Sequence, residues 1–153
     1  FFTNFYIGLI PGNRSRGRFP GEVDKDFVRG CQELFLIQVA LLKPAVIITL
    51  GLPVPRLIAP LAQQLKPWEG LSSIKDLNAD PFFHGVKFSG EHDPCTVVGV
   101  IHPCYATRNI RHRVYIGYTG PDVEELILKD AFAAISRTDH GPPEWMRMPD
   151  PSS

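Results

Sequence analysis

The segment Lys43-Pro44-Ala45-Val46-Ile47-Ile48-Thr49-Leu50-Gly51 decides the fold. The residue before a proline is pushed out of the helical region, so a helix that precedes this segment has to end at Lys43. Residues 45–50 then form a continuous apolar run that is rich in β-branched side chains. A run that is apolar on both faces is typical of a strand buried in a parallel sheet. We therefore predict a buried parallel strand over 45–50, which Gly51 ends.

Helical patterns lie on both sides of this strand. Residues 24–42 place apolar side chains at helical spacing, with Asp24 suited to the N-cap position. The apolar stripe of this helix comprises Phe27, Cys31, Leu34, Phe35, Val39 and Leu42. Downstream, Pro53 suits the first turn of a second helix, which we predict over 53–65.

The same patterns continue towards both ends of the chain. Residues 1–7 are short, aromatic and β-branched, which predicts a strand, and the apolar run 96–101 predicts another. Residues 121–137 predict a last helix, with Leu126, Ile127, Ala131, Ala134 and Ile135 facing inward. Residues 66–80 predict irregular structure, residues 109–119 fit no single pattern, and the proline-rich residues 138–153 predict an extended tail. Strands alternating with helices predict an α/β fold with a mainly parallel sheet.

Composition limits the class of protein. The 153 residues suit one domain, and 44% hydrophobic with 21% charged residues argues against disorder and coiled coil. With 16 basic and 16 acidic residues the net charge is +0, so a strongly basic nucleic-acid binder is not indicated. A neutral total can still hide a local basic patch. The apolar stretch 39–54 is interrupted by Lys43 and Pro44 and is shorter than the ~20 residues of a membrane span.

Cysteine usage and the N-terminus predict the compartment. Three cysteines without CxxC spacing favour reduced thiols and a cytoplasmic protein. The N-terminus lacks the basic region of a signal peptide, and the chain begins with Phe1 inside a predicted strand, which suggests a fragment. We expect a monomer.

Polar or small residues end the predicted strands, and these ends predict a site. Asn4, Gly51 and the pair His102-Pro103 each follow an apolar run. Ligands of open α/β sheets bind beyond the carboxyl ends of the strands, so these residues should meet at one rim. The Asn4 amide can donate and accept towards a base edge, or it can cap a turn. His102 can donate a hydrogen bond to a developing anion, or it can be an ordinary turn histidine.

Two groups of basic residues lie in predicted loops. The first comprises Arg14, Arg16 and Arg18, and the second comprises Arg108, Arg111, His112 and Arg113. Both groups can contact phosphates or can be solvated loop charges.

Motifs for bound cofactors are missing from the sequence. His102 and the three cysteines lack the spacing of a metal site, so no metal is predicted. The glycine-rich motifs of nucleotide-binding folds and the G-x-S-x-G motif of α/β-hydrolases do not occur. We predict no cofactor.

The ordered set of motifs resembles the uracil-DNA glycosylase superfamily, especially its bacterial family-4-like and uncharacterised branches. The set consists of Phe2-Thr3-Asn4-Phe5-Tyr6, an Arg- and Pro-rich loop, the helix with Cys31, the segment 43–51, and Val100-Ile101-His102-Pro103-Cys104-Tyr105. The resemblance covers residues 1–137 and is carried mainly by the K-P-x-x-I-I-T-L-G string and the H-P pair. It implies a three-layer α/β/α sandwich.

The resemblance also assigns roles to residues of this chain. Asn4 would recognise a uracil flipped out of DNA, with Gly51 beside the base, and His102 would stabilise negative charge on the departing base. The loop after His102 would enter the DNA. Its DNA-binding residues would be Pro103, Cys104, Tyr105, Arg108 and Arg111.

The chain departs from the family pattern at several positions. Cys104 replaces the serine of the usual H-P-S motif, and a DNA or backbone hydrogen bond of that hydroxyl is therefore in question. An iron–sulfur branch of the family uses four cysteines; Cys31 matches one of them and Gly8 stands at another, so we predict no cluster. The family's first strand, and its first motif with the water-positioning residue, are expected before Phe1.

The sequence therefore predicts a DNA-repair enzyme of base excision that acts on DNA by base flipping. The expected reaction is hydrolysis of the N-glycosidic bond of uracil or a related deaminated base. Without the water-positioning motif, we expect the 153 residues to be a poor catalyst. The alternatives are a non-catalytic nucleic-acid-binding relative of the same fold and an unrelated small-molecule binder on a flavodoxin-like sheet.

Overall fold

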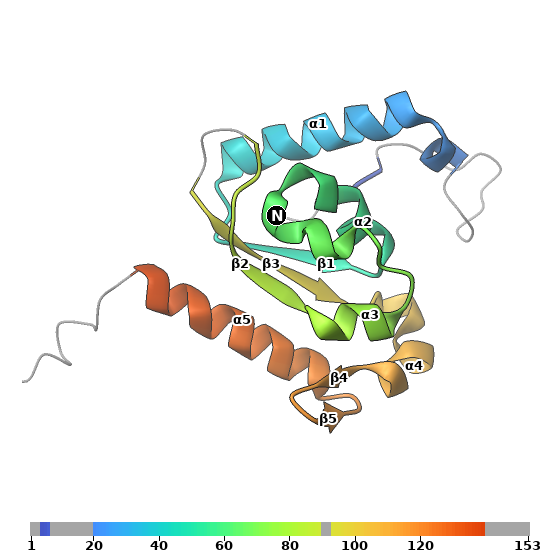
Figure 1. Ribbon diagram of the computed structural model, residues 1–153, viewed down its shortest axis with the longest axis vertical. Coiled ribbons are helices and arrows are strands. Elements are labelled where there is room, and N and C mark those ends of the chain that lie inside the picture. The colour runs from blue at the N-terminus through green and yellow to red at the C-terminus, as the bar shows by residue number, and fades with distance from the viewer. Residues whose placement is uncertain (1–3, 7–19, 90–92, 140–153) are drawn as a thin grey trace, which may run out of the picture.

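The computed structural model describes residues 4–6, 20–89 and 93–139 (Figure 1). These residues form a mixed α/β fold in which helices pack on both faces of a small sheet. The predictions for Gly8, the basic group Arg14, Arg16 and Arg18, and residues 140–153 lie outside the described residues.

The central sheet has strand order β1-β3-β2, with β1 at Val46–Leu50, β2 at Phe82–Val86 and β3 at Cys95–Val100. β1 and β3 pair in parallel, from Val46 opposite Thr96 to Leu50 opposite Val100. This pairing confirms the two strands that the apolar runs predict. β2 pairs antiparallel to β3, so the sheet is mixed rather than mainly parallel. The sequence analysis did not predict β2.

Burial differs between the two predicted strands. β3 is buried along its whole length, because Val97 faces one layer of helices and Val98 faces the other. β1 was also expected to be fully buried, but Thr49 is its one buried residue and Ile48 is 45% exposed. The reason is position: among the described residues, β1 pairs with a neighbour on one side only.

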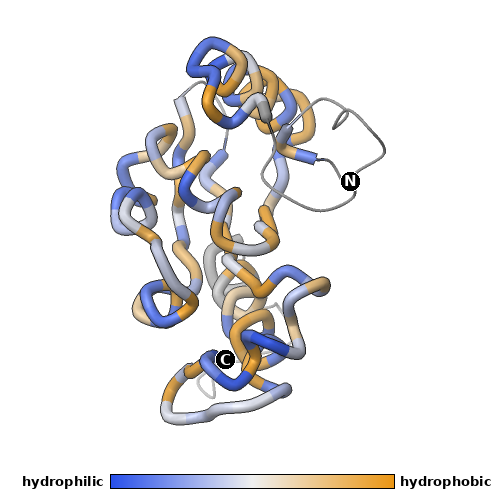
Figure 2. The backbone as a smooth tube through the Cα atoms, turned by 90° about the vertical axis from the view of Figure 1, so that its right-hand side faces the viewer, coloured by the Kyte–Doolittle hydropathy of each residue, from blue (hydrophilic) through white to orange (hydrophobic). Residues whose placement is uncertain are grey.

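The first long helix follows its prediction closely. α1 spans Lys25–Leu42, and the Asp24 carboxylate accepts hydrogen bonds from the backbone N–H of Asp26 at 2.9 Å and of Phe27 at 3.1 Å. Both bonds satisfy amides that the first helical turn leaves without partners. Lys43 caps the other end in the left-handed region, directly before Pro44. Figure 2 shows hydrophobic and hydrophilic positions mixed along α1, as expected for a helix that covers one face of a core.

The second predicted helix is interrupted. α2 covers only Pro53–Ile58 and is followed by 3₁₀ turns at Ala59–Leu61 (η2) and Gln63–Trp68 (η3). Pro60 cannot donate the backbone hydrogen bond that a continuous helix would need there.

Residues 66–80 are more ordered than predicted. Beyond η3, α3 spans Ile74–Ala79 and begins with a capping box between Ser73 and Asp76. Hydrogen bonds from Ser72 and Ser73 lower the pKa of Asp76 to about 2. The Ser-x-x-Asp spacing is the local signal that could have predicted this helix.

The last helix runs slightly further than predicted. α5 spans Val123–Asp139, so the predicted tail loses its first residues to the helix. Ile127 and Ala131 are fully buried as expected, and Val123 joins them.

Short elements connect β3 to α5. They are the 3₁₀ turn η4 (Pro103–Tyr105), α4 (Ala106–Asn109), the 3₁₀ turn η5 (Ile110–His112) and a hairpin of β4 (Val114–Tyr115) and β5 (Tyr118–Thr119). A further 3₁₀ turn, η1 (Pro20–Val23), precedes α1.

Two hydrophobic cores stabilise the sheet from its two faces. The larger core joins α1, α2 and η3 to the sheet and includes Trp68, Leu65 and Val97. The smaller core joins α5 to the other face through residues such as Ile127 and Val98. Figure 1 shows this arrangement, with α1 and α2 on one side of the strands and α5 on the other.

The predicted N-terminal strand is not seen in its described part. Asn4–Tyr6 form a bend, and Phe5 packs on Phe35 of α1 with ring centroids 6.1 Å apart. A strand needs a hydrogen-bonded neighbour, and no described strand pairs with this segment. Within the described ranges, no helix is both long and apolar enough to cross a membrane.

Candidate functional site

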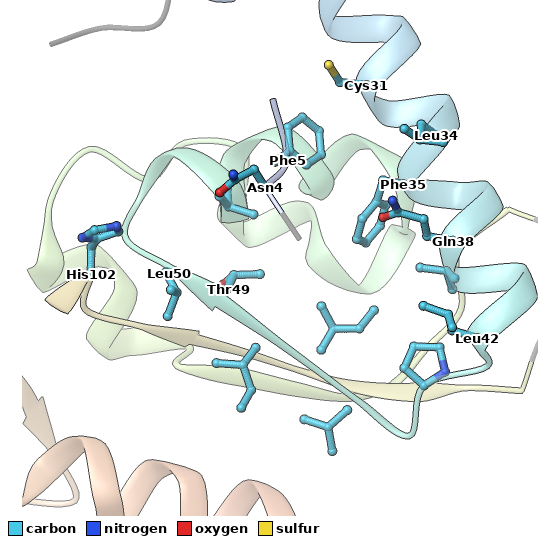
Figure 3. A pocket seen from close by; sticks show the side chains of 16 residues that line it. Asn4, Phe5, Cys31, Leu34, Phe35, Gln38, Leu42, Thr49, Leu50 and His102 are labelled. Carbon is cyan, nitrogen blue, oxygen red and sulfur yellow. The ribbon is translucent and has the colours of Figure 1, made fainter. Parts of the chain in front are cut away.

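A cavity of about 670 Å³ lies between α1, the N-terminal bend and the edge of β1 (Figure 3). Its walls are mostly apolar, and the described residues that line it include no Asp, Glu, Lys or Arg. The lining residues are Asn4, Phe5, Cys31, Leu34, Phe35, Gln38, Val39, Leu42, Pro44, Val46, Ile47, Ile48, Thr49, Leu50, Val54 and His102.

One wall is the edge of β1 that has no paired strand among the described residues. The Ala45 carbonyl accepts from the Thr96 N–H at 2.9 Å, and the Gly51 N–H donates to the Val100 carbonyl at 2.8 Å. The backbone N–H and C=O groups of the odd-numbered residues of β1 therefore point towards β3. Backbone groups alternate in direction along a strand. Those of Val46, Ile48 and Leu50 therefore point away from β3, towards the side on which the cavity lies.

Gly51 brings the ends of β1 and β3 together. It has a φ of +74°, a left-handed conformation that glycine adopts without a steric penalty. A Cβ atom at this position would lie 3.2 Å from the Cβ of His102. Both conditions favour glycine. The predicted residues Gly51 and His102 thus lie side by side at the carboxyl ends of the two parallel strands.

The orientation of the His102 ring follows from one hydrogen bond. Its Nδ1 accepts from the backbone N–H of Cys104 at 3.2 Å, in the turn that Pro103 begins. A neutral imidazole that accepts at Nδ1 carries its proton at Nε2. The Nε2–H group is then a hydrogen-bond donor for a molecule in the cavity.

Asn4 lines the same cavity as His102. In Figure 3 its amide and the His102 ring both lie towards the end of the cavity where β1 terminates at Leu50, while Gln38 and Leu42 lie at the other end. Asn4 and His102 therefore line one cavity and Gly51 lies beside His102, but the described residue Asn4 stands in a bend and not at the end of a strand. The hydroxyl of Thr49, by contrast, is bonded to the Val98 carbonyl at 3.0 Å and is buried.

The loop that follows His102 presents the other predicted residues on the surface. Pro103, Cys104 and Tyr105 form the exposed turn η4, and the Tyr105 ring centroid is 6.0 Å from that of His102. Arg108 and Arg111 are exposed on α4 and η5.

Arg113 is a correction to the predicted basic group. The sequence placed it among phosphate-contacting or solvated residues, but its side chain is fully buried and pairs with Glu124 at 2.9 Å. Sequence reasoning also missed Glu124. The pair is formed by tertiary packing, and no local pattern marks it.

The cysteines lie in different environments. Cys31 and Cys95 are buried and Cys104 is exposed, and none forms a disulfide. Burial raises the pKa of the Cys95 thiol to about 11, which makes it unreactive near neutral pH. In the described ranges, no group of three or more His, Cys, Asp or Glu side chains is arranged to hold a metal ion.

Comparison with known proteins does not identify a relative of this chain. No family model, curated protein or solved structure matches the chain. The geometry of the cavity and the residues that line it are therefore the basis for assigning a function.

Proposed function

We propose that this protein is a DNA glycosylase of the uracil-DNA glycosylase type, hydrolysing the N-glycosidic bond of uracil or a related deaminated base in DNA. The observation that carries the proposal is the cavity that Asn4 and His102 share at the carboxyl end of β1. In this proposal the mixed sheet and its two layers of helices correspond to the three-layer α/β/α sandwich of that superfamily.

The cavity suits a flipped base. Its volume of about 670 Å³ falls within the range of roughly 300–1,000 Å³ for small-molecule pockets. Apolar and aromatic walls, including Phe5 and Phe35, favour a planar heterocycle over a charged ligand. An amide such as that of Asn4 can accept from uracil N3–H and donate to O4, whereas cytosine presents the reversed pattern.

His102 has a direct role in this mechanism. As the bond between C1′ of the sugar and N1 of uracil breaks, its electron pair passes to the base and spreads over N1 and O2. The Nε2–H of His102 donates to this developing anion. Water adds its hydroxyl to the cationic C1′ and releases its other proton to the solvent, from which the uracil anion is protonated. A fixed donor aimed at a charge that appears only in the transition state accelerates the reaction.

The position of the cavity supports the fold assignment. The resemblance places a strand between the segment of Asn4 and the strand 45–50. Among the described residues, Asn4–Tyr6 do not pair with β1, and the cavity lies between this segment and β1. Direct pairing of the two segments would have argued against the family.

One observation favours the alternative, a nucleic-acid-binding relative without chemistry. No carboxylate is present among the described residues that line the cavity, so these residues offer no general base to activate water. A positioned acid or base contributes roughly 10²–10⁴-fold to rate. We therefore expect the 153-residue chain to bind uracil-containing DNA and to excise the base slowly.

The test compares duplex oligonucleotides that differ only in one U or T. We expect the chain to bind the U duplex more tightly and to leave abasic sites, detected by alkaline strand cleavage after long incubation. Asn4→Ala should abolish the preference for U, because it removes both hydrogen bonds to the base edge. Gln38→Ala, which changes an amide at the other end of the same cavity, is the matched control and should retain the preference.

The outcomes separate the two candidates. Preferential binding without any abasic product favours the binding protein. Equal affinity for both duplexes together with no product rejects the proposed base-binding site.

The loop after His102 makes a further prediction about DNA contact. Replacing exposed Tyr105 by alanine should weaken duplex binding by ~1–3 kcal/mol if its ring stacks on a base. Arg108→Ala should reduce the slope of log K against log[salt] by about 0.9, the value for one phosphate contact. Binding measured at several salt concentrations checks both.

Lys129→Ala, which removes an exposed charge on α5, should leave the slope unchanged. Wild-type affinity and slope in both loop variants would show that the loop does not contact DNA.

A further inference from the structure

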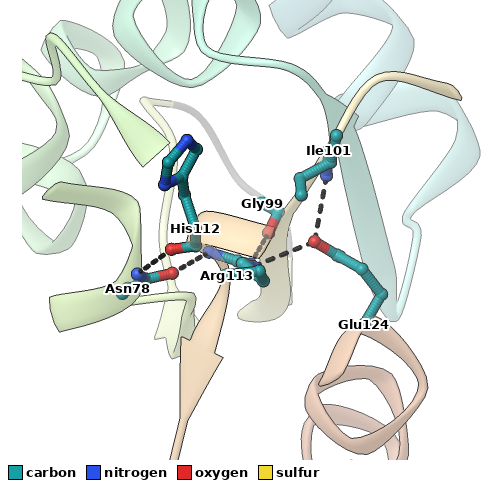
Figure 4. Close-up of polar contacts among 6 residues, drawn as sticks. All are labelled: Asn78, Gly99, Ile101, His112, Arg113 and Glu124. Carbon is teal, nitrogen blue, oxygen red and sulfur yellow. Dashed lines mark hydrogen bonds and ion pairs between the residues drawn. The ribbon is translucent and has the colours of Figure 1, made fainter. Parts of the chain in front are cut away.

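Both ends of the His102 loop bind to one carboxylate oxygen (Figure 4). The chain leaves the sheet at Ile101, whose backbone N–H donates to Oε1 of Glu124 at 3.2 Å. It returns at Arg113, whose Nε donates to the same Oε1 at 2.9 Å. Residues 102–112 lie between these two points and include every residue of the predicted DNA-contacting loop.

Arg113 is held by three elements at once. Besides Glu124 of α5, its Nη2 donates to the Gly99 carbonyl of β3 at 2.6 Å and its Nη1 donates to Oδ1 of Asn78 in α3 at 3.2 Å. Asn78 in turn donates to the carbonyl of His112, the last residue of the loop, at 2.9 Å. A planar guanidinium with donors in a fixed fork constrains the positions of all these groups.

Stabilisation alone does not account for this arrangement. Arg113 is 0% exposed, and buried ion pairs are often no more stabilising than apolar residues of similar size, because both charges lose their hydration. Burial accordingly raises the pKa of the Glu124 carboxyl and lowers that of Arg113, while the attraction between the two groups opposes both shifts. The second carboxylate oxygen, Oε2, is buried and has no hydrogen-bond partner in the described structure. The Glu124 carboxylate thus binds both ends of the loop through Oε1, although its burial costs hydration free energy.

We propose that Arg113 and Glu124 are positioning residues that close the 102–112 loop and thereby hold the His102 ring with its Nε2–H towards the cavity. The inference rests on the proposed function for its catalytic meaning, but the geometric part concerns His102 alone. Ile101 is the residue before His102, so the Glu124 bond to its N–H fixes the strand exit from which the imidazole projects. The second fixed point at Arg113 prevents the loop from rotating about that exit. Cys104 then stays where its N–H can bind Nδ1.

The decisive variant is the double replacement Arg113→Met with Glu124→Leu. It removes both charges together, so no unpaired charge is left in the core, and circular dichroism checks that the variant folds. We expect the double variant to lose the single His102 tautomer, which nitrogen chemical shifts of the ring report. We also expect hydrogen exchange of the Cys104 amide to become about tenfold faster, which is the change expected when one hydrogen bond that keeps the loop closed is lost. A residue pair that only stabilised the fold would leave the His102 tautomer of the folded state unchanged, even if amide exchange became faster.

A second pair of variants isolates the carboxylate. Glu124→Gln keeps the side-chain shape but removes the charge, and it should shift the tautomer ratio in the same direction. Glu125→Gln is the matched control, since it makes the same change one residue further on, in an exposed ion pair with Lys129. Wild-type tautomer and exchange in both the double variant and Glu124→Gln would overturn the proposal.

Binding of the U duplex by the same variants separates this inference from the proposed function. If the wild-type chain does not prefer the U duplex while the tautomer still depends on Glu124, the proposed function fails and the positioning role stands. If the wild-type chain prefers the U duplex and every variant keeps both the preference and the His102 signals, the positioning role fails alone.

Discussion

Replacement of His102 by alanine is expected to lower the single-turnover rate of uracil excision by about 10²–10³-fold, the usual loss on removing one oxyanion-stabilising donor. The Nδ1 of His102 is bonded to the Cys104 N–H, which leaves Nε2–H to stabilise the departing base. The rate is measured with enzyme in excess over a U-containing duplex, so that product release does not contribute. Because binding of the ground state does not need this hydrogen bond, duplex affinity should change much less than the rate.

The leaving group provides a sharper test of the same residue. With 5-fluorouracil in place of uracil, the electron-withdrawing fluorine already stabilises the anion, so the loss caused by His102→Ala should shrink. Equal losses on the two substrates would mean that His102 acts on base flipping or binding instead. His112→Ala is the matched control, because His112 lies at the other end of the same loop and is exposed. It should retain the wild-type rate on both substrates.

Local signals in the sequence were sufficient for the parts of the fold that position the cavity. The Asp24 cap, the proline after Lys43 and the apolar runs of β1 and β3 each have a nearby physical cause. Parallel pairing then follows from the helices between the strands, and it brings strand-end residues to one edge. This is why the sequence alone is sufficient to predict that Gly51 and His102 lie together.

Burial of β1 could not be predicted in the same way. Its composition is that of a strand covered on both faces and paired on both edges. How many neighbours a strand has depends on the rest of the sheet, and here the described residues provide one. The side chain of Ile48 is therefore 45% exposed and lines the cavity instead of a closed core.

Long-range partners account for the other failures. Arg113 follows Arg111 and His112 in a basic stretch, and only the fold shows that it is buried against Glu124, Asn78 and Gly99. β2 was missed because its five residues include Gly85 and the exposed His84, which weaken an alternating pattern. For residues 66–80 the sequence predicts irregular structure, because prolines and short turns hide their contribution to the core.

Trp68 shows how large that contribution is, and Trp68→Ala is expected to reduce the free energy of unfolding by ~3–5 kcal/mol, as for other large core aromatics. Its side chain is 0% exposed, its ring meets that of Phe83 edge to face at 5.2 Å, and its Nε1–H donates to the Asp80 carbonyl at 2.8 Å. Urea unfolding followed by circular dichroism measures the loss. The exposed Phe132 is the aromatic control, and its replacement by alanine should change stability by no more than about 0.5 kcal/mol.

Trp68→Phe distinguishes the two contributions of this side chain. Phenylalanine keeps much of the ring volume but leaves the Asp80 carbonyl without its donor. Trp68→Phe should therefore reduce the free energy of unfolding less than Trp68→Ala does, and the difference measures the packing contribution of the ring. Trp68 does not line the cavity, and the folded fraction of either variant should therefore keep the wild-type preference for the U duplex. A loss in Trp68→Ala no larger than in Phe132→Ala would contradict the placement of η3 in the core. If a folded variant lost the preference for the U duplex, the segment 63–80 would instead influence the shape of the cavity indirectly, through the central sheet that both contact.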